Sequence, residues 1–200
     1  MPALPCVVAR VVAAAAILAA VPAVVPALAE PTVSESVHYY DVSGATGREV
    51  RASLNREGPV SSSDNKRYDA VCRWHVYWKF QYRQRGNACG ITSATTDVKI
   101  VITFPRLKTD ETTSSSLVKA FAVYTEKLMV HEKGHAQNAI DAARKIEAGI
   151  LALPSEPTCD ALRTKANDLG HALIKEANQA DSDYDRLTRH GATQGARFPQ

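Results

Sequence analysis

The residues whose types and spacing can do chemistry are concentrated at positions 130–135, which read VHEKGH. His131 and His135 are four residues apart, so on a helix they lie one above the other on the same face. Two imidazoles in that arrangement can bind one zinc ion (Zn2+) at about 2.0–2.1 Å each. Glu132 points to the side, where its carboxylate can act as general base toward a water activated by the metal without ligating it. This HExxH pattern predicts a zinc-dependent peptidase; the plain alternative is a chance match on an amphipathic helix.

A catalytic zinc needs three protein ligands and an open fourth position. His190 lies three residues beyond the apolar stripe of the last predicted helix, so we expect it on the side facing the core, just before Gly191 ends the helix. Its alternative role is that of a cation at the helix C-terminus. The runner-up ligand is Asp141, six residues after His135. HExxH proteins that use this position leave the helix at a glycine, and here Asn138 stands in its place. We therefore predict that His131, His135 and His190 bind zinc.

Polar residues near His190 can support such a site. Asp185 or Thr188 can accept the free N–H of an imidazole and so orient it. Tyr184 can donate to an oxyanion, or simply pack in the core as a member of the helical stripe. His75 falls on the polar face of a predicted strand and can line a substrate groove.

The patterning along the chain predicts an α+β fold. Alternating apolar and polar residues indicate strands at 32–40, 74–83 and about 98–104. Thr46 can cap a short helix over 47–56, and Thr158 can cap a last helix over 159–187. Because the turn at 86–90 is too short for a crossover helix, we expect a small, mostly antiparallel sheet. With the HExxH helix and the C-terminal helix behind it, the predicted arrangement is zincin-like.

The HExxH segment falls inside a helical pattern that runs from about 114 to 153. An unbroken helix of that length would measure roughly 57 Å, whereas a compact domain of this size is only about 40 Å across. We therefore expect this helix either to bend or to protrude.

The first 29 residues have the pattern of an export signal. They contain a single charge, Arg10, then an apolar run over 11–28 that closes on the small-x-small sequence at 27–29. The alternative is an uncleaved anchor, which Pro22 and Pro26 disfavour. We predict a signal peptide at 1–29 and a single mature domain at 30–200 in the periplasm or medium, with no membrane segment after cleavage.

The mature domain keeps three cysteines. Cys72 is in phase with the apolar side of a strand, as expected for a buried thiol. Cys89 and Cys159 both sit in predicted turns, which makes them the better pair for a disulfide in an oxidising compartment. Charge carries little information: the chain has 24 Lys and Arg against 21 Asp and Glu, and no basic stretch that indicates nucleic-acid binding.

Several segments together resemble the bacterial family called domain of unknown function 922, whose members are described as predicted secreted zinc-dependent proteases. The segments are WHVYWKFQYR, the turn cysteine Cys89, VKIVITFP, HEKGH, Cys159 and the terminal YDRLTRHG. The resemblance spans about 39–198. It implies a Cys89–Cys159 bridge and a site made of His131, Glu132, His135 and His190.

Two functions follow as hypotheses. The first is a secreted or periplasmic zinc peptidase that hydrolyses peptide or protein substrates with Glu132 as general base. The second is a non-enzymatic exported envelope protein with a structural or vestigial metal site. An open fourth metal position in a groove favours the first, and a closed four-ligand shell favours the second.

Overall fold

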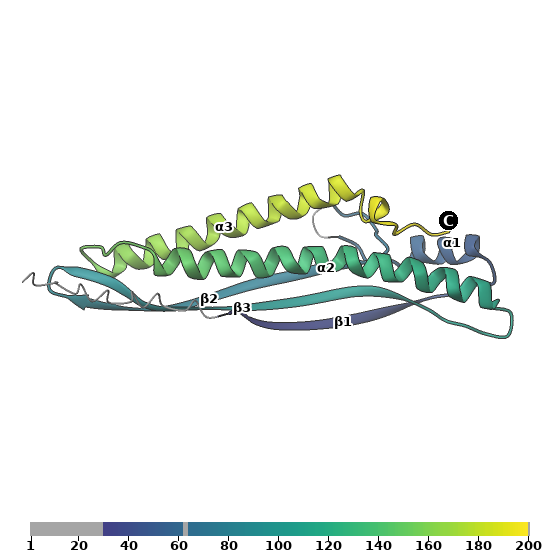
Figure 1. The fold of residues 1–200 in the computed structure, drawn as a ribbon, viewed down its shortest axis with the longest axis horizontal. Helices are drawn as coiled ribbons and strands as arrows, with labels where there is room; N and C mark the ends of the chain where they lie inside the picture. Colours follow the sequence, from purple (N-terminus) through teal and green to yellow (C-terminus); the bar gives the residue numbers. More distant parts are fainter. Residues whose placement is uncertain (1–29, 62–63, 200) are drawn as a thin grey trace, which may run out of the picture.

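The computed structural model describes residues 30–61 and 64–199, so the predicted signal peptide lies outside the described residues. It confirms the α+β class, with both long helices on one face of a small sheet (Figure 1). The elements in chain order are β1 (Thr32–Val42), α1 (Gly47–Glu57), β2 (Val71–Arg85), β3 (Ala88–Leu107), α2 (Ser115–Leu151), α3 (Cys159–Thr188) and the 3-10 turn η1 (Ala192–Gln194).

The sheet is mixed, so the expectation of a mostly antiparallel sheet is met only in part. Its strand order is β1-β3-β2. β2 and β3 form the expected antiparallel hairpin, but β1 pairs with β3 in parallel. The reason is that the chain reverses twice between them, once through α1 and once at the hairpin. After two reversals β3 runs in the same direction as β1 and lies beside it.

α2 does not need to bend or to protrude beyond the rest of the molecule, because the strand β3 that it packs on is longer than the helix. It is one continuous helix of 37 residues, about 55 Å at 1.5 Å per residue. β3 has 20 residues, about 66 Å at 3.3 Å per residue, and follows the helix along the molecule (Figure 1). The assumption of a compact domain was therefore wrong, and the molecule is elongated.

The core lies between β3 and α2. Alternate residues of β3 are buried, among them Val98, Ile100 and Ile102, as expected for a strand with one covered face. They pack against the apolar stripe of α2, including Phe121 and Ile146. Side-chain caps start all three helices: Thr46 with a full capping box, Ser114 and Thr158. The two helix starts predicted from Thr46 and Thr158 are thus confirmed.

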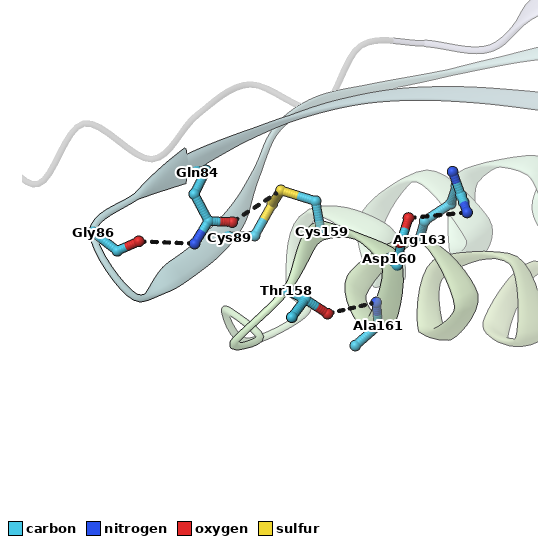
Figure 2. Close-up of a disulfide and its surroundings, with 8 residues drawn as sticks. All are labelled: Gln84, Gly86, Cys89, Thr158, Cys159, Asp160, Ala161 and Arg163. Atoms are coloured by element: carbon cyan, nitrogen blue, oxygen red, sulfur yellow. Dashed lines mark hydrogen bonds and ion pairs between the residues drawn. A yellow bond between two sulfur atoms is a disulfide. The ribbon is translucent and has the colours of Figure 1, made fainter.

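A disulfide fastens the hairpin to α3 at the end of the molecule opposite α1 (Figures 1 and 2). Cys89, near the start of β3, is joined to Cys159, the first residue of α3, with 5.1 Å between their Cα atoms. The predicted pairing is confirmed, and Cys72 is a free, half-buried thiol. Among the described residues, no helix combines the length and apolarity that a membrane span requires.

Candidate metal centre

The HExxH residues are buried in the middle of α2. His131, Glu132 and His135 are 2%, 3% and 7% exposed. The Nε2 atoms of both histidines converge on one oxygen of α3: Asp185 Oδ1 lies 3.1 Å from His131 Nε2 and 3.2 Å from His135 Nε2. Ligand atoms of the three residues all lie within 4.8 Å of one another, so this cluster could hold a metal ion.

Two of the three distances between ligand atoms of the cluster fit a tetrahedral metal. Ligands about 2.0–2.1 Å from a tetrahedral zinc are about 3.3–3.4 Å apart. The two nitrogen–oxygen distances, 3.1 and 3.2 Å, are close to that value. The donor set of two imidazoles and one carboxylate is also one that zinc accepts.

The opposite nitrogens of the two rings are held by acceptors. Gln194 Oε1 is 3.0 Å from His131 Nδ1, and Asp181 Oδ1 is 3.1 Å from His135 Nδ1. An acceptor at Nδ1 favours the tautomer with its proton there, which leaves the Nε2 lone pair free for a metal. Both rings are therefore oriented with Nε2 toward the same point.

Asp181 joins three elements at this point. Besides His135 of α2, its carboxylate accepts a hydrogen bond from Trp74 Nε1 of β2 at 2.6 Å and one from Asn138 Nδ2 of α2 at 2.7 Å. Asp181 and Asp185 are four residues apart on α3, so they share a face of that helix just as the two histidines share a face of α2. The cluster thus forms where these two faces meet.

Close packing of α3 on α2 depends on the glycine within HEKGH. The Tyr184 ring stacks on His131 with 5.0 Å between centroids and 11° between planes. A Cβ on Gly134 would lie 2.2 Å from Tyr184 Oη, so only glycine leaves room for this ring. The Tyr184 hydroxyl in turn accepts a hydrogen bond from Gln194 Nε2 at 2.9 Å. Of its two expected roles, the structure shows the packing role.

Three consecutive residues reverse the chain after α3. Arg189, His190 and Gly191 have φ of 51°, 51° and 81°, which is left-handed backbone. This conformation is uncommon for residues with a Cβ, such as Arg189 and His190. The reversal brings Gln194 in η1 back to His131. At Gly191 a Cβ would lie 3.1 Å from His131, so the turn packs directly on this histidine.

His190 lies at the edge of the cluster. α3 ends at Thr188, so His190 does not continue the buried stripe, and its side chain is 48% exposed. Its Nδ1 is nevertheless 3.2 Å from Asp185 Oδ1, and its ring packs against Tyr68 with 4.6 Å between centroids. Its role as a ligand stays a prediction.

The sequence also pointed to Asp141, His75 and Thr188. Asp141, on the exposed side of α2, accepts hydrogen bonds from Gln137 and Arg144, away from the cluster. His75 lines the cleft described below. Thr188 lies near His131, with its hydroxyl 3.4 Å from Nδ1.

Burial and charge shift the pKa values of the cluster in opposite directions. Burial raises the pKa of Glu132 to about 7, with the neighbouring histidines acting against it. Burial lowers the pKa of His135, but hydrogen bonds to Asp181 and Asp185 outweigh this effect and raise it to about 10. Burial also opposes ionisation of Asp185, yet bonds from His131 and His135 hold its pKa well below the ordinary value. Without a metal, His135 is therefore a cation paired with Asp185, and a binding metal must displace that proton.

The cluster opens into a cleft of about 900 Å³. It is lined by His131, Glu132 and His135 of α2, by residues 66–75 and by the C-terminal half of α3. An ion held by the cluster would be accessible to molecules in this cleft.

The sequence predicted only an orienting role for Asp185 and did not identify it as a possible metal donor. The signal that points to it is the pair Asp181 and Asp185, which repeats the four-residue spacing of the histidines on a second helix.

A family model described as bacterial protein of unknown function (DUF922) matches residues 37–191. The comparisons with curated proteins and with solved structures found no match.

Proposed function

The chain belongs to the DUF922 family of bacterial proteins of unknown function, and we propose that this member is an exported zinc-dependent peptidase. One observation carries the proposal: two imidazole Nε2 atoms and a carboxylate oxygen converge beside a buried glutamate at the floor of an open cleft. The zincin-like character predicted for the fold belongs to the same proposal.

The metal would be held by His131, His135 and a donor from the end of α3. Asp185 is favoured for the third position because its Oδ1 already lies against both Nε2 atoms. His190, the ligand predicted from sequence, is the alternative, since its Nδ1 is 3.2 Å from the same oxygen. When bound, zinc supplies a Lewis acid that polarises the scissile carbonyl and lowers the pKa of water.

Glu132 would move the proton. Its carboxylate lies on the same helix turn as the two histidines and accepts a hydrogen bond from the Cys72 backbone. With a pKa raised by burial to about 7, it is poised to take a proton from water and pass it to the leaving amine near neutral pH. Asp181 and Gln194 would keep the two imidazoles in the metal-binding tautomer.

Export is supported by the disulfide. Disulfides persist in the periplasm and outside the cell and are rare in the cytosol. The Cys89–Cys159 bridge therefore agrees with a signal peptide at 1–29.

One observation favours the alternative of a non-enzymatic envelope protein: His190 Nδ1 lies 3.2 Å from Asp185 Oδ1, near enough for both residues to hold one ion. If Asp185 and His190 both ligate, the metal has four protein donors, and a closed shell of that kind is structural.

Zinc stoichiometry and hydrolysis of a peptide library, measured on the same preparations, test the proposal. Wild type should bind one zinc ion and cleave, and Glu132→Gln should bind zinc without cleaving. Asp185→Asn should lose zinc, and Asp141→Asn is the matched control because its carboxylate lies outside the cluster. Zinc retained in wild type and Glu132→Gln with no cleavage by either would support the structural site. Loss of zinc in His190→Ala but not in Asp185→Asn would assign the third position to His190.

A further inference from the structure

Part of the cleft is lined by consecutive residues. Positions 66–75 all line it, and 71–75 of these belong to β2. Successive side chains of a strand point to opposite faces, so a continuous run can line one wall only along the edge of the strand. The cleft is therefore bordered by the edge of β2 rather than by either face of the sheet.

This edge has no strand partner. In the order β1-β3-β2, β2 pairs with β3 on one side, and no strand of the described ranges 30–61 and 64–199 pairs with the other. The Cys72 backbone hydrogen-bonds to Glu132, so the free edge faces the HExxH residues. Because strand amides alternate in direction, the N–H groups of Trp74 and Val76 point the same way as that of Cys72.

The free edge and the metal cluster share one cleft. α3 contributes Asn178, Asp181, Ser182 and Asp185 to the lining of the same cleft. A chain running along β2 from Cys72 would thus enter this cleft beside His131, Glu132 and His135.

We propose that the free edge of β2 binds an extended polypeptide as a fourth strand and holds its backbone across Glu132. The substrate class, which rests on the proposed function, is then unfolded or extended polypeptide, not folded protein or small amides. Backbone groups of an edge strand are satisfied by another extended backbone, whose own N–H and C=O groups must be free. Helical and tightly folded segments have no such free groups to offer.

The test uses hydrogen exchange in the full mature chain carrying Glu132→Gln, so that the probe is not consumed. The probe is reduced, carboxymethylated ribonuclease A, and native ribonuclease A is the matched folded form of the same sequence. With the unfolded probe we expect the amides of Trp74 and Val76 to exchange at least about tenfold more slowly; the Cys72 amide is left out because it already donates to residue 132. Amides of β1, an edge strand outside the cleft, should be unchanged and serve as the internal control.

The outcomes separate this inference from the peptidase proposal. If wild type cleaves the unfolded probe while β2 gains no protection in Glu132→Gln, edge binding is overturned and the peptidase stands. Equal protection of β1 and β2, or equal effects of native and unfolded ribonuclease, also overturns edge binding. Protection of β2 without any cleavage by wild type supports edge binding and counts against the peptidase.

Discussion

The Tyr184 hydroxyl occupies the space that a side chain at Gly134 would need, 2.2 Å from the position of its Cβ. The same ring lies flat on His131, and its hydroxyl is bonded to Gln194. The glycine inside HEKGH therefore determines how closely α3 approaches the histidines.

Gly134→Ala should destabilise the fold and weaken zinc binding. Alanine gains about 1 kcal/mol in helix propensity, but displacing a stacked, hydrogen-bonded ring from a packed contact costs about 1–3 kcal/mol. Because Asp185 follows Tyr184 on α3, the displacement also moves the carboxylate away from the imidazoles. Urea unfolding and zinc titration measure the two effects.

Gly149→Ala is the matched control on the same helix. Its Cβ would meet only the end of the Leu169 side chain, Cδ2, at 2.9 Å. That side chain can move, so stability should be unchanged or higher, and zinc affinity should equal that of wild type. Equal zinc affinity in Gly134→Ala would contradict the role given to Gly134.

Asp181→Asn should lower zinc affinity by about 10–100-fold. The Asp181 carboxylate accepts from three N–H donors, whereas an amide offers one oxygen and sets its NH2 against the remaining donors. His135 then loses the acceptor that fixes its tautomer. Competition with a zinc chelator measures the affinity. Asp183→Asn, which removes an exposed carboxylate of the same helix, is the control.

Stability should fall as the pH rises above about 10, the ordinary pKa of tyrosine. Burial, together with the charge of Asp69, raises the pKa of Tyr124 and Tyr40 well above that value. A group whose pKa is raised by folding stabilises the native state fully below its unfolded pKa, and this contribution is lost as the pH rises toward its folded pKa. Urea unfolding between pH 8 and 11 measures the decline.

Tyr124→Phe isolates one of these phenols. It removes the hydrogen bond to Asp69 and so lowers stability at pH 8 by about 1–3 kcal/mol. It should also flatten the alkaline decline by up to about 1.4 kcal/mol per pH unit, because one fewer proton is released on unfolding. A decline as steep as that of wild type would show that Tyr124 is not responsible.

Replacing the disulfide should cost stability without emptying the metal site. The bridge joins residues 70 positions apart, and closing a loop of that length is worth about 4 kcal/mol in the chain-entropy model. The double variant Cys89→Ser, Cys159→Ser should unfold at lower urea concentration yet bind one zinc ion, because the cluster lies on other parts of α2 and α3. Cys72→Ser controls for loss of a thiol. Loss of zinc from the folded double variant would contradict this separation.

Local features of the fold were predictable because their causes are local. The caps at Thr46 and Thr158 and the helical spacing of His131 and His135 each depend on residues within one or two turns. The parallel pairing of β1 with β3 was not predictable in this way, because it joins strands about 65 positions apart in the sequence.

The site was predictable only in part for the same reason. The α2 half follows from HExxH, but the partner of the two Nε2 atoms depends on how α3 crosses α2, and that is set by the contact of Tyr184 with Gly134. The position of His190 depends on left-handed backbone at Arg189 and His190, which the apolar stripe of the helix does not reveal.

The reversal at residues 189–191 brings the segment that follows α3 back to the His131, His135 and Asp185 cluster. Phe198 is buried against Tyr124, and its carbonyl is bonded to Arg51, so the end of the chain is anchored on α1 and α2. A product truncated just after Gly191 would still contain every proposed metal donor, yet His131 would lack its Gln194 acceptor. Trimming these residues should thus weaken zinc binding before it reaches any proposed ligand, and an affinity tag is better placed before β1.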